Sequence, residues 1–387
     1  MNSPAALTTG LYVHVPFCRR KCLYCDFYSI TDLSRRASYL RALAVEMGRV
    51  AEAASAPVDT LYIGGGTPSV LEAGSLERIL ATAGKTFPFL PRAEVTLEAN
   101  PGTLDSDLLR AFKAGGGNRL NIGVQSFRDE RLRFLGRVHS GQAAVQAIDA
   151  ARAAGFDNIG LDLIYGLPGQ TRADWLADLQ RAVAFAPEHL ACYLLTYEPG
   201  TPLERLRRAG RVQPLAESAA AELFDATCEY LASAGYRQYE ISNFARTDAH
   251  RSRHNLKYWT GAPYVGLGPS AHSFSGTERR WNVRSVDQYV RSLAAGRLPV
   301  EGRERLDRSQ QMIEALYLGL RMTAGIDLEA FDRRFGVDFR GEYRELLAEF
   351  GAEGYVAIAA GRCALTRRGM RFQDSITARF VCAGTGA

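Results

Sequence analysis

Short apolar runs alternate with amphipathic stretches along the first 240 residues, and this alternation limits the possible fold more than any other feature. Strands are expected at 11–15, 60–64, 94–99, 119–124, 158–166 and 190–198. Helices are expected near 35–54, 71–85, 104–114, 141–154, 172–186 and 216–234. Strands that alternate with helices indicate parallel βαβ units. Since six units are fewer than the eight that close a TIM barrel, we predict an α/β fold with a partial (β/α)6 TIM-like barrel.

The pattern changes after about residue 240, and we predict three parts. Residues 1–242 form the partial barrel, and residues 243–300 form a connecting segment that is rich in Gly, aromatic residues and Arg. Residues 301–387 read as helices followed by strand, Gly turn, strand and helix, which resembles a winged helix. This last part carries 13 basic and 13 acidic residues. Because a nucleic-acid footprint is basic, we expect a mostly helical accessory domain and no nucleic-acid partner.

Residues suited to chemistry stand at or near the carboxyl end of the predicted strands. They are a cysteine cluster after residue 15, the run Gly64-Gly65-Gly66-Thr67-Pro68, Glu98, Gln125 and Asp162. In parallel α/β folds these strand ends meet on one side and build the active site. The sequence therefore predicts one site to which several strands contribute.

Three cysteines in the spacing Cys18-x3-Cys22-x2-Cys25 are the most specific of these signals. Three thiolates can ligate three irons of a [4Fe–4S] cluster and leave the fourth iron open to another ligand. A zinc site completed by His14 is the alternative metal centre. The chain has seven cysteines, and an odd number in a reducing compartment suits metal binding better than disulfides.

This cysteine spacing at a strand end resembles the motif of the radical S-adenosylmethionine (SAM) superfamily. In that family the methionine amine and carboxylate of SAM chelate the open iron, and reductive cleavage gives a 5′-deoxyadenosyl radical. The resemblance implies SAM as a cofactor, with Arg137 as a bidentate donor to its carboxylate. It implies Glu98 and Asp162 as acceptors for the ribose hydroxyls or the ammonium, and Gln125 as a ribose partner. The remaining implied SAM contacts are Tyr12, Tyr24, Gly65, Gly66 and Thr67.

Longer stretches sharpen the resemblance to the coproporphyrinogen III dehydrogenase-like branch of this superfamily. They include "YVHVPFCRRKCLYC", "YIGGGTPS", "NRLNIGVQSF", "GLDLIYGLPGQT" and "RHNLKYWTG". The dehydrogenases of this branch carry Cys-x3-Cys-x2-Cys-x-Cys and an N-terminal extension. Here Phe27 stands at the fourth cysteine position, and 17 residues precede Cys18. Both departures favour the HemW-type haem chaperones, which bind haem and pass it to other proteins.

The stretch "HNLKYW", 254–259, resembles the His-Asn-x-x-Tyr-Trp motif of that haem-binding group. An imidazole can ligate haem iron, so His254 is the predicted axial ligand, with His272 as a weaker alternative. Tyr258 and Trp259 can pack on a porphyrin face. The net charge of +6 over 243–300 suggests an anionic ligand. The candidate partners for haem propionates are Arg251, Arg253 and Lys257.

We therefore expect a haem chaperone with a [4Fe–4S] cluster, SAM and haem. Two alternatives stay open: an oxygen-independent coproporphyrinogen III dehydrogenase, and another porphyrin-directed radical SAM enzyme. The resemblance implies haem-acceptor proteins as partners, with respiratory haemoproteins and bacterioferritin as examples. No apolar run is long enough to span a membrane and no signal peptide is evident, so a cytoplasmic location is expected. The sequence leaves open whether SAM is cleaved and whether the protein docks peripherally on a membrane.

Overall fold

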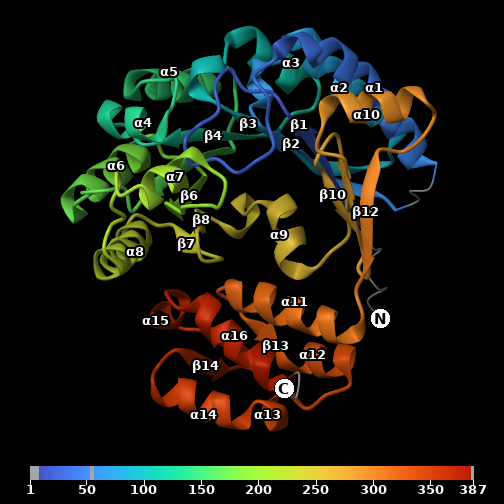
Figure 1. Cartoon of the computed structure of the whole chain (residues 1–387). Coiled ribbons are helices and arrows are strands. Elements are labelled where there is room, and N and C mark those ends of the chain that lie inside the picture. Colours follow the sequence, from blue (N-terminus) through green and yellow to red (C-terminus); the bar gives the residue numbers. More distant parts are fainter. Residues whose placement is uncertain (1–7, 53–55, 385–387) are drawn as a thin grey trace.

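The computed structural model describes residues 8–52 and 56–384, and its main body is one open sheet with helices packed around it (Figure 1). Six parallel strands lie side by side in chain order at the centre of that sheet. They are β1 (Thr9–Val15), β2 (Val58–Gly65), β3 (Phe89–Ala99), β4 (Arg119–Gln125), β5 (Ile159–Tyr165) and β6 (His189–Leu194). The predicted partial barrel is confirmed, because the sheet does not close on itself.

Helices cover the outer face of the parallel strands. They are α1 (Arg36–Ala51), α2 (Ala73–Thr86), α3 (Ser106–Ala114), α5 (Gly141–Ala153), α6 (Arg172–Ala184) and α8 (Glu217–Ser233). Two short helices, α4 (Asp129–Leu135) and α7 (Pro202–Arg208), pack instead against the loop that follows β1. Single 3-10 turns lie at Leu33–Arg35, Pro68–Val70, Pro101–Thr103 and Asp248–His250. Local signals start and stop these helices: a capping box of Thr171 and Asp174 begins α6, and Gly136, with φ 76°, ends α4.

The segment 243–300, which we expected as a connection, contributes strands to both edges of the sheet. On the β1 side, β9 (Tyr264–Leu267) pairs in parallel with β1. Three antiparallel strands then extend the sheet: β10 (His272–Phe274), β11 (Glu278–Asn282) and β12 (Val300–Arg305). On the β6 side lies β8 (Asn243–Ala245), which pairs with β7 (Arg237–Gln238) from just before this segment. Two helices complete this segment, α9 (Arg253–Thr260) and α10 (Val286–Ala294).

A mostly helical C-terminal region forms a second layer next to α9 (Figure 1). Its helices are α11 (Arg308–Arg321), α12 (Leu328–Phe335), α13 (Phe339–Glu342), α14 (Arg344–Ala352), α15 (Arg367–Met370) and α16 (Gln373–Gly384). A small sheet in the order β13-β15-β14 accompanies them, from Ile326–Asp327, Arg362–Leu365 and Val356–Ala359. Arg321 of α11 joins this region to the barrel, because it pairs with buried Glu240 at 2.7 Å and lies over the Trp259 ring.

The two faces of the parallel strands differ in polarity. Leu11, Val13 and Val15 of β1 are fully buried in the main hydrophobic core, whereas Tyr12 and His14 between them point the other way, into the barrel. The concave interior of the barrel is therefore lined by polar and aromatic groups. No helix in the described part of the chain is long and apolar enough to span a membrane.

Candidate functional site

The cysteine loop follows β1 directly and lies at the carboxyl ends of the parallel strands. Hydrogen bonds from Leu23 N to Leu135 O and from Leu203 N to Leu23 O anchor the loop to α4 and α7, at 3.2 and 2.9 Å. Thr67 Oγ1 lies 3.3 Å from Cys18 Sγ, and Arg137 Nη1 lies 3.6 Å from Cys22 Sγ. Two of the three sulfurs thus have a polar neighbour from outside the cysteine loop.

The three thiols lie near one another, and the site has the donor set of an iron–sulfur cluster. Burial raises the pKa of Cys25 to about 11, and the charges of Cys22 and Cys18 add to this effect. Within 8–52 and 56–384, no three His, Cys, Asp or Glu side chains are arranged to hold a single metal ion. A [4Fe–4S] cluster needs no such convergence, because each thiolate binds a different iron.

His14 is engaged in a way that does not suit the zinc alternative. Its Nδ1 lies 3.1 Å from the Tyr12 hydroxyl, and its Nε2 lies 2.8 Å from the Tyr28 carbonyl oxygen. Burial lowers the pKa of His14 to about 4, so the ring is neutral near pH 7. With both nitrogens occupied, His14 holds the base of the cysteine loop and has no free nitrogen for a metal.

The glycine run at the end of β2 packs against the start of the cysteine loop. Gly65 has φ 109°, and a Cβ there would lie 2.7 Å from the His14 ring. A Cβ on Gly66 would lie 2.8 Å from Phe17 O. The amides of Gly66 and Thr67 donate to Val15 O and Phe17 O at 2.9 and 2.8 Å. These residues are glycines because the two strand ends approach so closely, which brings Thr67 to Cys18.

Two carboxylates from β3 and β5 face the barrel interior. Glu98 accepts from the Tyr62 hydroxyl at 2.7 Å and from Gly65 N at 3.1 Å. Asp162 accepts from Asn121 Nδ2 at 2.7 Å through one oxygen. Burial raises the pKa of Glu98 to about 7, with the Asp162 charge as a further cause, and burial raises the pKa of Asp162 to about 6.

Gln125 and Arg137 meet at the end of β4. Gln125 is buried and has φ 66°, an uncommon backbone conformation for a non-glycine residue. Arg137 Nη2 donates to Gly123 O at 2.7 Å, and its side chain also bonds Tyr24. Arg137 therefore connects β4 with the cysteine loop through Cys22 and Tyr24.

Several polar atoms in this region are buried and have no partner. They are Gln125 Oε1, Arg137 Nε and Asp162 Oδ1, and deeper in the barrel Arg119 Nε and Nη2. Buried polar atoms are nearly always hydrogen-bonded in native proteins, and an unfilled ligand site is one physical reason for exceptions. The structure thus brings Glu98, Gln125, Arg137 and Asp162 to one polar interior beside the cysteines.

His254 lies elsewhere, at the opposite ends of the strands. Its Nδ1 is 2.8 Å from Thr60 Oγ1 and its Nε2 is 2.9 Å from the Tyr258 hydroxyl. Its ring is 0% exposed and stacks on Tyr62 with 5.2 Å between ring centroids. Burial lowers the pKa of His254 to about 3. Glu94 accepts the backbone amide of His254 at 3.0 Å, so the start of α9 is fixed against β3.

The basic residues near His254 are already paired. Lys257 is buried and lies 2.8 Å from Asp59, and Arg253 lies 3.7 Å from the same carboxylate. Arg251 pairs with Asp248 at 2.6 Å. The predicted propionate partners therefore already have partners of opposite charge.

Phe27, at the position of a fourth cysteine in the dehydrogenases, projects from the cysteine loop. It is 65% exposed, the highest exposure among the exposed large hydrophobic side chains. Nothing in the described part of the chain covers this ring.

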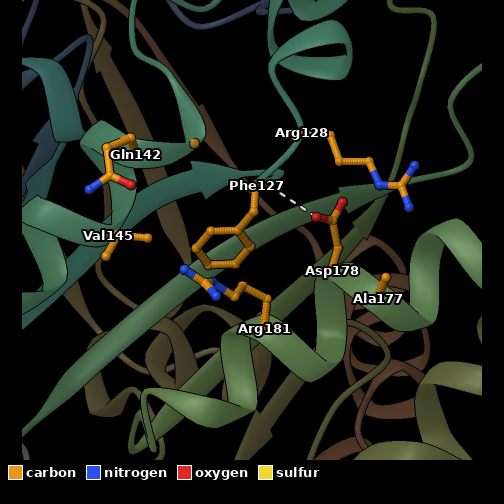
Figure 2. A pocket seen from close by; sticks show the side chains of 8 residues that line it. Phe127, Arg128, Gln142, Val145, Ala177, Asp178 and Arg181 are labelled. Atoms are coloured by element: carbon orange, nitrogen blue, oxygen red, sulfur yellow. Dashed lines mark hydrogen bonds between the residues drawn. The ribbon is translucent and has the colours of Figure 1, made fainter.

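A separate pocket of about 320 Å³ lies on the outer surface between α5 and α6 (Figure 2). Asp178 in its wall accepts from Phe127 N at 3.0 Å and from Ser126 Oγ at 2.7 Å. Figure 2 shows this carboxylate turned toward the Phe127 backbone. Since the Asp178 carboxylate is already hydrogen-bonded, this pocket lacks the unpartnered polar atoms found at the strand ends.

Sequence reasoning did not single out Tyr62 and Asn121, the direct partners of Glu98 and Asp162. Both stand at inward positions of strands, where an apolar run is interrupted by a polar group. Alternation along β2 and β4 could have identified them, because residues two apart face the same side of a strand.

Comparisons with known proteins agree with this geometry. The family model described as "Radical SAM superfamily" matches residues 12–182, and the one described as "HemN C-terminal domain" matches residues 306–372. The "Heme chaperone HemW" of Bacillus subtilis is 33% identical, over 96% of this chain and 98% of that protein. The "Heme chaperone HemW" of Mycobacterium tuberculosis is 36% identical, over 95% and 93%.

A solved structure shares the fold over nearly the whole length. Coproporphyrinogen III oxidase (HemN) from Escherichia coli, described as a radical SAM enzyme, aligns with a TM-score of 0.82 and 24% identity. The alignment covers 96% of this chain and 90% of that one. The arrangement of an open α/β barrel with a mostly helical C-terminal region is therefore that of HemN.

Proposed function

Because the chain belongs to the radical SAM superfamily and, within it, to the HemW family, we propose that it binds haem and transfers it to acceptor haemoproteins. The observation that carries the proposal is similarity over nearly the full length to proteins named haem chaperones. Phe27 supports it as well, since a dehydrogenase of this branch would carry a cysteine there. Respiratory haemoproteins and bacterioferritin are the acceptor classes that the family resemblance implies.

The strand-end site supports a cluster and SAM as resident cofactors. Cys18, Cys22 and Cys25 would hold the [4Fe–4S] cluster. When bound, the cluster supplies electrons to SAM, which is chemistry that belongs to the cofactors. The protein's part is to orient them. Arg137 offers a guanidinium between Cys22 and Gln125, and Glu98 and Asp162 offer carboxylates on β3 and β5, the strands on either side of β4.

The other SAM contacts that we propose lie around these side chains. They are Tyr12, Tyr24, Gly65, Gly66, Thr67 and Gln125. The unpartnered atoms of Gln125, Arg137 and Asp162 support the proposal, since a polar ligand would satisfy them together.

From the motif resemblance we propose His254 as the haem ligand. Its hydrogen bonds set a condition for this role. Iron can bind this imidazole only if its hydrogen bond to Thr60 or to Tyr258 breaks and α9 moves to admit the porphyrin. Haem binding through His254 would therefore be coupled to a rearrangement of α9.

The test loads ferric haem onto the reconstituted full-length chain without oxygen and then adds apo-bacterioferritin. We expect a Soret band on loading and its passage to the acceptor fraction after size-exclusion separation. Haem mixed with the acceptor alone is the control for passive uptake. A chain that binds no haem contradicts the proposal.

A second arm separates the dehydrogenase alternative. The same protein is incubated with coproporphyrinogen III, SAM and a reductant, and the porphyrins are analysed. We expect coproporphyrinogen III to be recovered unchanged. Formation of protoporphyrinogen IX would overturn the chaperone function in favour of oxidative decarboxylation.

A further inference from the structure

Arg119, the first residue of β4, is buried deep in the barrel without a partner. Its exposed fraction is 1%, and its Nε and Nη2 have no hydrogen-bond partner. The guanidinium also forms no ion pair with the residues that the structure describes. A charge that is removed from water is normally paired, because an isolated buried charge is costly. This guanidinium therefore lacks the opposite charge that its burial requires.

The carboxylates of the neighbouring strands are bonded to other groups. Strand β4 lies between β3 and β5, which carry Glu94, Glu98 and Asp162. Glu94 accepts two backbone amides at the start of α9, both at 3.0 Å. Glu98 accepts from a tyrosine hydroxyl of β2, and Asp162 accepts from an asparagine side chain of β4. Among the described residues, no carboxylate is thus left to serve as the counterion of Arg119.

His189 of β6 has a second unpartnered nitrogen in the same interior. Its Nε2 lies 2.8 Å from the Tyr239 hydroxyl, whereas its Nδ1 is buried and has no partner. The Ser252 amide donates to that hydroxyl oxygen at 3.4 Å, so the hydroxyl proton can be donated to Nε2. Nδ1 then carries the ring proton. Burial lowers the pKa of His189 well below its ordinary value, so the ring is neutral and its Nδ1–H is a donor without an acceptor.

Gly160 of β5 makes room between these two donors. It pairs with Asn121 of β4 on one side and with His189 on the other, so the three residues face the same side of the sheet. A Cβ at Gly160 would lie 3.5 Å from Arg119 Nη2 and 3.3 Å from His189 Nδ1. The guanidinium and the imidazole therefore converge on one point, and the glycine leaves that point free of a side chain. We call Arg119, Gly160 and His189 the Arg119 site.

The Arg119 site has the chemistry of a carboxylate site. A guanidinium can donate two parallel N–H bonds to the two oxygens of a carboxylate, and the His189 Nδ1–H can donate a third. Water can accept the same bonds, but it carries no charge to balance Arg119. A metal cation would be repelled by the guanidinium.

The Arg119 site is also connected to the start of α9. Ser252, whose amide bonds the Tyr239 hydroxyl, is the N-cap of this helix and is buried. Tyr239 in turn bonds His189. Two hydrogen bonds thus link the imidazole of the Arg119 site to α9, the helix that carries His254.

We infer that the Arg119 site binds a carboxylate, which the guanidinium holds with His189 Nδ1–H as the second donor. Two sources supply this chemistry: a small free carboxylate ion, or a propionate of haem that reaches the barrel interior beside α9. The first source is independent of the proposed haem-chaperone function, and the second rests on it.

The first arm of the experiment replaces sodium chloride with sodium formate at constant ionic strength and follows thermal unfolding of the cluster-reconstituted full-length chain. A ligand that binds only the folded state raises the unfolding midpoint as its concentration grows. Arg119→Met should weaken formate binding by about tenfold or more, since hydrogen bonds to a charged group are lost. In formate-free buffer this variant should unfold at the wild-type midpoint or above it, because it removes an unpaired buried charge.

The matched control is Arg131→Met, which removes another largely buried arginine. Arg131 lies in α4 and pairs with Asp174 at 3.4 Å, so this change should lower the midpoint but leave the formate response as in the wild type. Arg119→Lys is the second variant if Arg119→Met does not fold. It keeps the charge but loses the planar fork, and its formate response should fall as well.

The second arm compares haem with iron protoporphyrin IX dimethyl ester, in which both propionates are esterified. If a propionate occupies the Arg119 site, the wild type should bind haem more tightly than the ester, and Arg119→Met should remove that difference. The inference is overturned if formate leaves the wild-type midpoint unchanged and the Arg119 variants keep the wild-type preference for haem. A chain that binds no haem would contradict the proposed function, while the formate arm would still decide the inference.

Discussion

The two ends of the barrel use similar residues in opposite ways. Toward the carboxyl ends of the strands, Gln125, Arg137 and Asp162 each leave a buried polar atom without a partner. At the other end, His254 has partners for both ring nitrogens and Lys257 is paired with Asp59. An unpaired buried polar group costs about 1–3 kcal/mol of folding free energy, so the unpaired atoms of Gln125, Arg137 and Asp162 lower the stability of the fold. The comparison teaches that the strand-end site leaves bonding capacity beside the cysteines, whereas His254 and Lys257 are already bonded and would have to give up a partner to bind a ligand.

The largest expected effect comes from the cysteines at the strand ends. Replacing any one of Cys18, Cys22 and Cys25 with Ala should abolish the near-visible absorption after anaerobic reconstitution, because the loop sequence contains no fourth cysteine to substitute. Iron and sulfide content per chain measure the effect. Cys228→Ala is the control, since this buried cysteine lies in α8 and should leave the cluster intact. Full iron content in the triple Ala variant would contradict the assignment of these three cysteines as cluster ligands.

The next effect tests the structural role of His254. His254→Ala leaves Thr60 and Tyr258 without a partner and opens a cavity, so the free energy of unfolding should fall by about 3 kcal/mol. Chemical denaturation measures this change, and the iron content should stay at the wild-type level. His250→Ala should change stability by less than about 0.5 kcal/mol. An unaltered unfolding midpoint in His254→Ala would contradict a structural role for His254 and with it the difference between the two ends of the barrel.

Arg137 should matter for binding more than for folding. Arg137→Ala removes a buried charged donor beside Gln125 and should weaken SAM binding by about 2 kcal/mol, or about 30-fold in Kd. Calorimetric titration of the reconstituted protein measures this affinity, and iron content must be checked because Arg137 also contacts Cys22. Arg133→Ala, an exposed change on the neighbouring helix, is the control. Equal affinities in the two variants would count against the proposed SAM contacts.

The smallest effect is a pH dependence at the strand ends. Burial raises the folded-state pKa of Glu98 to about 7, above its ordinary value near 4.5, so folding favours the protonated acid. Its contribution to stability is therefore complete below about pH 4.5 and is lost as the pH rises through about 7. Glu98→Gln should reduce this pH-dependent loss of unfolding free energy by about 1–2 kcal/mol. Denaturation midpoints between pH 5 and 8 measure it, and an unchanged slope would mean that Glu98 is ionised throughout.

The strands and helices of the barrel could be predicted because burial imposes a period on each segment. Runs rich in apolar residues marked β1 to β6, and the predicted bounds lie within five residues of the observed ones. The extension β9 to β12 was not predicted. Strands of three to six residues with Gly and Arg carry little periodic signal, and their partner β1 lies far away in the sequence. Strand pairing over such distances depends on tertiary contacts that no local pattern records.

The site shows the same limit. Spacing alone brought the three cysteines together, and strand ends identified Glu98 and Gln125, because parallel strands end on one side. Asp162 lies in the middle of β5, and its side chain reaches the same interior. The same reasoning could not locate His254, since a short helix in a loop has no fixed relation to the sheet. Its burial depends on Thr60 and Glu94, which stand almost 200 and exactly 160 positions earlier in the chain. The resemblance of "HNLKYW" to a haem-binding motif carried no information about which way its histidine faces.

Because β1 pairs with β9, this edge of the sheet can be completed only late in synthesis of the chain. About 250 residues separate these neighbours, so at about 5–20 residues per second the ribosome needs roughly 13–50 s to deliver β9 after β1. During that time β1 has only β2 beside it, and its other edge is an open template for strand addition. Chains that end before residue 264 should therefore aggregate during synthesis, whereas chains that end after β12 should stay dispersed.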